Sequence, residues 1–287
     1  MSQPCIHARH HAETGTWTYV VSDPDSRAAA IIDPVLDFDA RGARIGTTEA
    51  EAVLAYCRAE GLRVEWILET HAHADHLSAA AWLKSRLGAK VGIGAGIRAV
   101  QSAFKPIFGM ESGFPTDGSQ FDRLFVDGDR LALGALEIEV IATPGHTSDS
   151  LSYRIDDAIF VGDSLFLPDA GSARCDFPGG DAGVLYDSIQ RLFALPDQTR
   201  MFVCHDYGPG GRAPQAQSTV AEQKAGNIHA RAAISRDEFV AMRRARDATL
   251  ALPALILPAV QVNIRAGELP PPDADGKRYL RLPIDTI

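Results

Sequence analysis

THAHADH, residues 70–76, is the segment from which the fold and chemistry of this chain can be argued. His71 and His73 are two positions apart, so they point to the same side of an extended segment, and Asp75 and His76 occupy the next turn. One short segment therefore offers up to four metal ligands. A lone histidine is usually an ordinary core or surface residue, but this concentration is hard to explain by chance.

Three further polar side chains follow apolar runs that are typical of strands. His146 follows LEIEVIAT (136–143) after a sharp Pro-Gly turn, Asp163 ends AIFVGD (158–163), and His205 follows the run that begins at residue 201. Sheets hold the loops at their strand ends rigidly, so these groups are expected to converge. Imidazole plus carboxylate without thiolate suits Zn, Fe or Mn rather than a thiolate-bound structural zinc.

Strands and helices alternate along the rest of the chain. The patterns predict strands at 16–22, 28–33, 64–70, 90–94, 130–134, 136–143, 158–163 and 201–206. They predict helices at 48–61, 77–88 and 184–195, with two more within 218–248. This order indicates an α/β (α+β) chain with two sheets covered by helices. We expect one domain over residues 1–287, ending in a Pro-rich irregular arm at about 268–287.

Composition excludes several classes of function. The 287 residues are 46% apolar and 23% charged, as in an ordinary globular protein, and carry a formal charge of −9. This charge disfavours nucleic acid and anionic membranes as partners. No apolar stretch approaches the roughly 20 residues that span a bilayer, and the polar N-terminus lacks a signal-peptide core, so we expect a cytoplasmic protein. The four scattered cysteines are expected to be free, and His7, His10 and His11 to be solvated.

The motifs HAHADH (71–76), PGHT (144–147), GDSLF (162–166) and CHD (204–206) resemble those of the metallo-β-lactamase superfamily. The resemblance implies an αββα sandwich, two mixed β-sheets flanked by helices, with a metal cleft at one edge. The family pattern assigns one metal position to His71, His73 and His146. It assigns a second to Asp75, His76 and His205, with Asp163 between the two. Because every position is filled, a dead scaffold is disfavoured, but the fold does not choose the reaction.

A narrower resemblance lies in segments 171–189, 205–211, 219–227 and 258–267. They are similar to the bacterial type of the persulfide dioxygenases, relatives of the ethylmalonic-encephalopathy protein. The resemblance implies that glutathione persulfide, O2 and water become sulfite and glutathione. It implies one Fe(II) per chain on His71, His146 and Asp163, with the supporting groups His73, Asp75, His76 and His205. Two imidazoles and one carboxylate leave positions open for substrate and O2 together.

The substrate residues follow less directly from the sequence. Glutathione carries two carboxylates, so an acidic chain must supply local donors, and the candidates are Tyr207, Lys224, Asn227 and Arg212. Where animal members of the family carry an arginine, this chain has His229, and its loop 207–218 is longer. Arg174 and Asp176 resemble a family pair that also involves the position of Asn263, a network that would orient the metal's surroundings. A structural salt bridge is the competing interpretation.

Two other functions remain open at this point. The first is a binuclear hydrolase with two zinc ions that cleaves a glutathione thioester, as hydroxyacylglutathione hydrolases do. Segments 173–177 and 262–267 resemble the dioxygenases more than these hydrolases. The second is a non-enzymatic metal-binding module of sulfur metabolism, which the complete ligand set disfavours. Members of the family are commonly dimers or tetramers, so the resemblance implies a homodimer or homotetramer.

Overall fold

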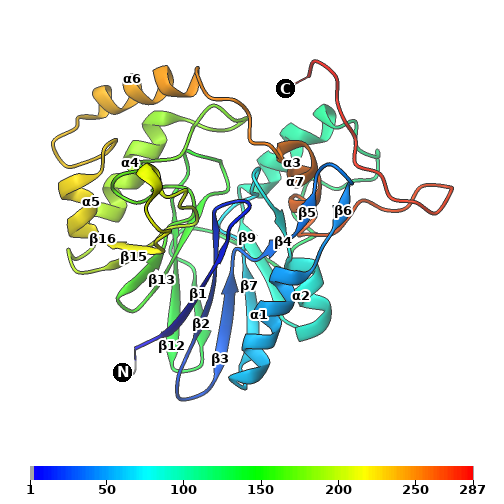
Figure 1. Cartoon of the computed structure of the whole chain (residues 1–287), viewed down its shortest axis with the longest axis horizontal. Helices are drawn as coiled ribbons and strands as arrows, with labels where there is room; N and C mark the ends of the chain where they lie inside the picture. The colour runs from blue at the N-terminus through cyan, green and yellow to red at the C-terminus, as the bar shows by residue number, and fades with distance from the viewer. Residues whose placement is uncertain (1–2, 287) are drawn as a thin grey trace.

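Two six-stranded sheets packed face to face form the centre of the computed structural model, which describes residues 3–286 (Figure 1). The first sheet contains, in spatial order, β1 (Cys5–His11), β2 (Thr16–Ser22), β3 (Ala28–Ile32), β7 (Arg63–Leu68), β9 (Lys90–Gly94) and β10 (Arg123–Phe125). Its first three strands are antiparallel, and from β3 to β10 neighbouring strands run parallel. The sheet is therefore mixed.

The second sheet is mixed as well. Its strands, in spatial order, are β11 (Arg130–Leu133), β12 (Leu136–Ala142), β13 (Leu151–Ile155), β14 (Ala158–Phe160), β15 (Arg200–Phe202) and β16 (Gln217–Thr219). Neighbours are antiparallel except for the parallel pair β14 and β15. Because those two strands run parallel, the segments that follow them leave the sheet at the same edge.

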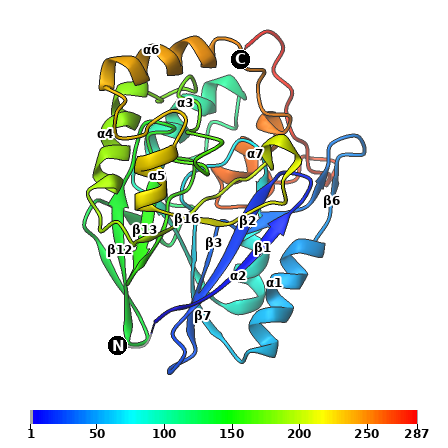
Figure 2. The ribbon, with the colours of Figure 1, turned by 60° about the vertical axis from the view of Figure 1, so that its left-hand side comes forward.

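Helices cover the outer face of each sheet (Figure 2). The first sheet is covered by α1 (Thr48–Ala59), α2 (Ala80–Leu87), α3 (Ile97–Ile107) and α7 (Ile256–Asn263). The second is covered by α4 (Ala182–Phe193), α5 (Val220–Gly226) and α6 (Arg236–Asp247). The layers are therefore α, β, β, α, and the expected sandwich of two mixed sheets flanked by helices is confirmed.

Three apolar clusters correspond to the three interfaces between these layers. The middle cluster joins side chains of both sheets, such as Ile32 and Leu68 from the first and Phe160 from the second. Tyr19 packs against Phe160 with ring centroids 4.9 Å apart. Fully burying one such side chain contributes about 1.5–3 kcal/mol, so the sheets hold each other in place. This packing fixes the strand ends that carry the polar residues.

Most predicted elements are present, but segment 77–88 is a correction. Leu77 and Ser78 form the short strand β8 (Leu77–Ser78), which pairs with β4 (Val35–Leu36), and the helix begins only at Ala80. It ends where expected, because Gly88 adopts the left-handed conformation that closes a helix. Helices α3 and α7 were not predicted. The four cysteines are free, as expected.

The N-terminal histidines are a second correction. They lie in β1 rather than in a solvated segment: His7 stacks on Tyr56, His10 is half-buried, and His11 is buried with Nδ1 2.8 Å from the Thr14 hydroxyl. The alternation of the strand was hidden because polar residues occupy both of its faces. His7 packs against α1, His10 against Trp17 of β2, and His11 against Thr14 in the β1–β2 turn.

The remaining elements are short. They are β5 (Phe38–Asp39), β6 (Arg44–Ile45) and the 3₁₀ turn η1 (Pro209–Gly211). No helix or strand occurs in segment 268–286, which Figure 1 draws in orange to red. Gln261 of α7 fastens this arm by donating to the Arg281 carbonyl and accepting from its amide. None of the helices in residues 3–286 is long and apolar enough to cross a membrane.

Candidate metal centre

The histidine loop leaves β7 and is held from two sides. Asn263 at the end of α7 donates to the carbonyl oxygens of His73 and His76, both at 2.8 Å. Its own carbonyl oxygen accepts from the Ser78 amide at 2.8 Å. On the other side the Asp149 carboxylate accepts from the Ala72 amide at 2.8 Å. The backbone of the loop is therefore fixed before any ion is bound.

His146 is presented by the turn after β12. Gly145 in that turn has φ +132, and a Cβ there would collide with the backbone of Leu185, so only glycine fits. The Nδ1 atom of His146 donates to the Arg174 carbonyl at 2.7 Å. This hydrogen bond fixes the tautomer and turns Nε2 toward Asp163, whose Oδ2 lies 3.7 Å away.

Asp163 follows β14 and completes the first group of ligands. Its Oδ2 lies 3.9 Å from His71 Nε2, and one ligand atom each from His71, His146 and Asp163 lie within 4.8 Å of one another. All three side chains are buried. Two imidazoles and one carboxylate so arranged are a donor set for zinc or non-haem iron.

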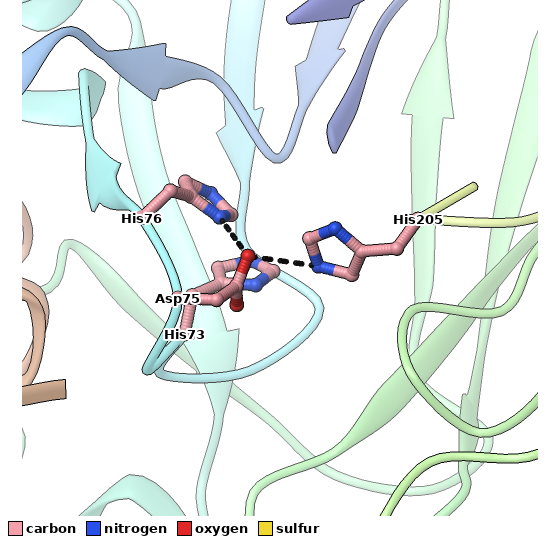
Figure 3. Close-up of side chains that lie close together, drawn as sticks. All are labelled: His73, Asp75, His76 and His205. Carbon is pink, nitrogen blue, oxygen red and sulfur yellow. Dashed lines mark hydrogen bonds and ion pairs between the residues drawn. The ribbon is translucent and has the colours of Figure 1, made fainter. Parts of the chain in front are cut away.

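Figure 3 shows a second group of possible ligands. It contains His73, Asp75, His76 and His205. The Oδ2 atom of Asp75 lies 3.2 Å from His76 Nδ1 and 3.2 Å from His205 Nε2. His205 Nε2 also lies 3.4 Å from Asp163 Oδ1, so the two groups are contiguous. The seven residues predicted from the sequence are thus brought together.

Buried polar atoms without partners test whether these residues fit a metal. Within residues 3–286 the side-chain atoms that are buried and lack a hydrogen bond include His71 Nε2, His73 Nδ1, His76 Nε2, His205 Nε2 and Asp163 Oδ1. Leaving one such group unsatisfied costs about 1–3 kcal/mol, and native proteins leave few. Two of these atoms belong to the first group of ligands and three to the second, and this concentration fits a site that binds metal.

The pKa shifts of His71 and His76 agree with this interpretation. Burial and the neighbouring imidazoles lower the pKa of His71 well below its usual 6.5. Burial and His73 likewise lower the pKa of His76 to about 4. Neutral imidazoles keep a lone pair for a metal. Burial raises the pKa of Asp163, against the opposing effect of His205 and His146.

Asp33 and Glu69 belong to the centre but were not predicted. Asp33, which follows β3, accepts from His73 Nε2 at 3.0 Å and from the Thr70 amide at 2.7 Å. Glu69 Oε2 lies 3.5 Å from the same His73 nitrogen. Burial alone would lower the pKa of His73, but these carboxylates raise it well above its usual value. Asp33 ends the predicted strand 28–33, so the strand-end rule that found Asp163 could have found it.

A cavity of about 610 Å³ opens from the centre to the surface. Asp75, His146 and Asp163 line it, together with residues of segment 249–255 and of α6. Its volume lies within the range of about 300–1,000 Å³ that is common for small-molecule sites. A ligand in this cavity could reach the metal-binding side chains directly.

The expected network of Arg174, Asp176 and Asn263 is only partly present. Arg174 lines the cavity and makes two hydrogen bonds to the Asp176 carboxylate, at 2.6 and 2.7 Å. It also donates to the Ala251 carbonyl at 2.6 Å. Asn263 is not part of this network, because it sits at the end of α7 and its side chain is fully used by the histidine loop. The prediction for Asn263 as a partner of Arg174 was wrong.

Of the residues predicted to bind substrate, Tyr207 lines the cavity. Its ring stacks on the His205 ring with centroids 5.8 Å apart, and the residue as a whole is 64% exposed. Arg212 lies off the cavity lining and is held by the carboxylates of Asp169 and Asp206. Lys224 also lies off the lining and pairs with Asp197 at 2.7 Å. The structure therefore leaves only the tyrosine in reach of a ligand there.

Asn227 and His229 are corrections of the same prediction. Asn227 is buried and donates to the Gly171 carbonyl and to Gln223, while its oxygen accepts from two backbone amides. His229 is buried behind Ser172, whose amide donates to His229 Nδ1 at 3.0 Å. Both side chains brace the cavity wall from behind. Sequence spacing could not show this, because it depends on how segment 171–176 packs on the start of segment 227–235.

Arg243 and Arg246 of α6 line the cavity and were not predicted. Arg243 is 1% exposed and pairs with Asp247, with Nε to Oδ1 at 2.8 Å. Burial, Arg243 and Arg246 lower the pKa of His229 to about 4. A helix in this part of the chain was predicted from the sequence, but nothing in the sequence indicated that one face of it would line this cavity.

Comparison with known proteins agrees with the fold and the donor set. Residues 12–205 match the metallo-β-lactamase superfamily, and the chain belongs to that superfamily. A protein of Burkholderia pseudomallei (strain 1710b) named a probable metallo-hydrolase is 51% identical over 96% of this chain and 97% of its own length. Glyoxylase B2 of Dictyostelium discoideum is 46% identical over 96% and 95%. The chain spans 65% of the length of a beta-lactamase hydrolase-like protein of Agrobacterium fabrum, which is 52% identical over 98% of this chain.

Persulfide dioxygenases are also among the homologues, so the resemblance in the sequence is confirmed. The mitochondrial persulfide dioxygenase ETHE1 of Bos taurus is 32% identical over 90% of this chain and 86% of its own length. The crystal structure of ETHE1 from Myxococcus xanthus superimposes with a TM-score of 0.74 at 32% identity, covering 92% of this chain and all of that one. The comparisons thus include proteins named as hydrolases and proteins named as dioxygenases.

Proposed function

We propose that this chain is a persulfide dioxygenase with one Fe(II) bound by His71, His146 and Asp163. The observation that carries the proposal is this buried donor set of two imidazoles and one carboxylate at the inner wall of an open cavity. It is supported by the persulfide dioxygenases among the homologues. Such a set leaves metal positions free for two ligands at once.

The proposed reaction converts glutathione persulfide, O2 and water to glutathione, sulfite and two protons. The S–S bond breaks, the terminal sulfur ends with three oxygen atoms, and the persulfide gives four electrons to O2. Bound ferrous iron would supply the redox-active centre at which sulfur and O2 meet. No other oxidant is needed.

The residues of the chain position the reactants. The Arg174 carbonyl holds the His146 ring by accepting from Nδ1, and Asp33 holds the His73 ring through Nε2. Phe166, Phe177 and the Tyr207 ring line the cavity beside these groups and limit the access of water. The proposal gives His73, Asp75, His76 and His205 the role of orienting and hydrogen-bonding groups.

A binuclear hydrolase is the second candidate. The observation that favours it is the second group, His73, Asp75, His76 and His205, which lies next to the first. Two relatives with 51% and 46% sequence identity carry the names probable metallo-hydrolase and glyoxylase B2. In that case two zinc ions would activate water against a glutathione thioester.

Metal content and oxygen uptake separate the two candidates. Protein purified without air is expected to contain about one iron per chain and to consume one O2 for each sulfite formed from glutathione persulfide. Two zinc ions per chain, with cleavage of lactoylglutathione and no oxygen uptake, would establish the hydrolase instead.

A pair of variants sharpens this experiment. His71→Ala should lose the iron and all turnover, because it removes one of three ligands. His76→Ala should keep about one iron per chain and part of the oxygen uptake, because His76 only supports the site in the proposed function. Loss of half of two bound metal ions in His76→Ala would contradict the mononuclear site.

A further inference from the structure

We propose that Arg246 binds a carboxylate of the thiol that carries the reacting sulfur, and so selects anionic carriers such as glutathione. The inference rests on the proposed function of the same cavity and names a specificity-determining residue for it. Arg246 lies in the last turn of α6 and lines the cavity that also contains His146 and Asp163.

Arg246 is the uncommitted cation among the arginines of the cavity. Arg174 is neutralised by two hydrogen bonds to Asp176, and Arg243 by its ion pair with Asp247 at 2.6 Å. Arg246 is exposed, and its guanidinium makes no hydrogen bond or ion pair with any residue between 3 and 286. An entering carboxylate would therefore find this guanidinium free for a bidentate contact.

The backbone that carries Arg246 is held rigidly over the cavity. Arg243 lies three positions before Arg246 and so on the same face of the helix, and Asp247 follows Arg246 directly in the chain. Arg243 also donates to the Ser172 carbonyl at 3.0 Å, and Asp247 accepts from the Cys175 amide at 2.9 Å. The arginine is thus mounted on an anchored element and not on a free loop.

The charges around the metal centre favour this orientation of a ligand. Asp75 and Asp163 line the cavity and repel a carboxylate, whereas a thiol or persulfide group would be attracted to a cation held by His71, His146 and Asp163. The wall near α6 also includes the apolar residues Ile228, Leu250 and Leu255. These apolar side chains cannot bind a carboxylate, so Arg246 is the favourable partner for it in this part of the wall.

The same helix provides a matched control. Arg244 lies in the same last turn and is also exposed, but it is two positions away and off the cavity lining. Both arginines can interact favourably with the C-terminal end of the helix dipole. A purely structural role of Arg246 would therefore be shared by Arg244, whereas a role in binding would not.

Calorimetric titration of the metal-loaded protein with reduced glutathione tests the proposal. Arg246→Gln is expected to weaken binding by about 10-fold or more, because it removes a charge-assisted contact, and Arg244→Gln to change it less than twofold. Glutathione diethyl ester, in which both carboxylates are blocked, should bind the wild type and Arg246→Gln equally. With glutathione persulfide, Arg246→Gln should raise KM and leave kcat within about twofold.

Several results would overturn the inference. Equal glutathione affinity of the wild type and Arg246→Gln would do so, and so would equal losses in both variants or an equal loss for the diester. The titration measures binding without turnover, so its result is independent of whether the protein oxidises persulfides. The titration tests Arg246, whereas oxygen uptake with glutathione persulfide tests the proposed function. Failure of one can therefore be told apart from failure of the other.

Discussion

His73 has one ring nitrogen committed to the protein and the other free. Its Nε2 is held by Asp33 and lies close to Glu69, while Nδ1 is buried without a partner. Carboxylates placed behind an imidazole fix its orientation and raise its basicity as a ligand or acceptor. Asp33 adopts φ +49, which is uncommon for a residue other than glycine. The strand end is therefore shaped to aim this carboxylate at the ring.

His229 leads to a prediction about acid stability. Its pKa is lowered to about 4 in the folded protein, mainly by burial, whereas the unfolded chain has a value near 6.5. The unfolded state therefore binds the proton first, and stability should fall as pH falls from about 6.5 to about 4. The variant His229→Asn keeps an acceptor for the Ser172 amide but cannot titrate. Urea unfolding at several pH values should show a smaller loss in the variant, by roughly 2–3 kcal/mol. Parallel losses would contradict the assignment.

Helix α7 acts on the metal centre through its last residue and on the C-terminal arm through Gln261. Asn263 holds two carbonyls and one amide of the histidine loop, and Gln261 holds Arg281. Both amides are buried, 4% and 3% exposed. Asn263 therefore supports the histidine loop, and Gln261 supports the C-terminal arm.

This separation can be measured with two variants of the same helix. Asn263→Ala should lower the free energy of unfolding by about 1–3 kcal/mol, because it leaves buried backbone groups unpaired. It should also weaken metal binding by about 10–100-fold, as is usual when supporting groups are removed. Gln261→Ala should keep the metal affinity of the wild type in a chelator competition. Equal metal affinity in both variants would show that the loop does not need Asn263.

The elements also show what the sequence could predict. The runs before His146 and Asp163 have local patterns that identify a strand and its end, so these residues could be placed at one edge. Leu77 and Ser78 follow the helical spacing of the next residues, and only pairing with β4 makes them a strand. The partners of Asn263 and the cavity-facing position of Arg246 depend on how α7 and α6 pack. Such tertiary contacts leave no trace in local periodicity.

At the scale of the molecule, the metal centre lies where the two sheets meet. His71 and His73 follow a strand of the first sheet, whereas Asp163 and His205 follow strands of the second. Backbone hydrogen bonds join the sheets here, from the Trp17 amide to the Cys204 carbonyl at 2.7 Å and from the Asp206 amide to the Gly15 carbonyl at 2.9 Å. A bound cation would therefore crosslink both halves of the sandwich.

Removal of the metal should consequently destabilise the whole sandwich. A ligand present at about a thousand times its Kd stabilises the folded state by about 4 kcal/mol, which corresponds to a rise in Tm of roughly 5–15 °C. Scanning calorimetry of chelator-treated and reconstituted protein should show this shift in one transition. Identical Tm values, or a shift in only one of two separate transitions, would contradict a metal shared by both sheets.

Arg174 contacts both the His146 ring and the outer part of the cavity, in addition to its ion pair with Asp176. Its carbonyl orients the His146 ring, and its side chain carries the Ala251 carbonyl in the outer wall of the cavity. Arg174 therefore couples the outer part of the cavity to the His146 ring. A ligand that is too bulky for the outer part and displaces Ala251 would also shift the imidazole through Arg174.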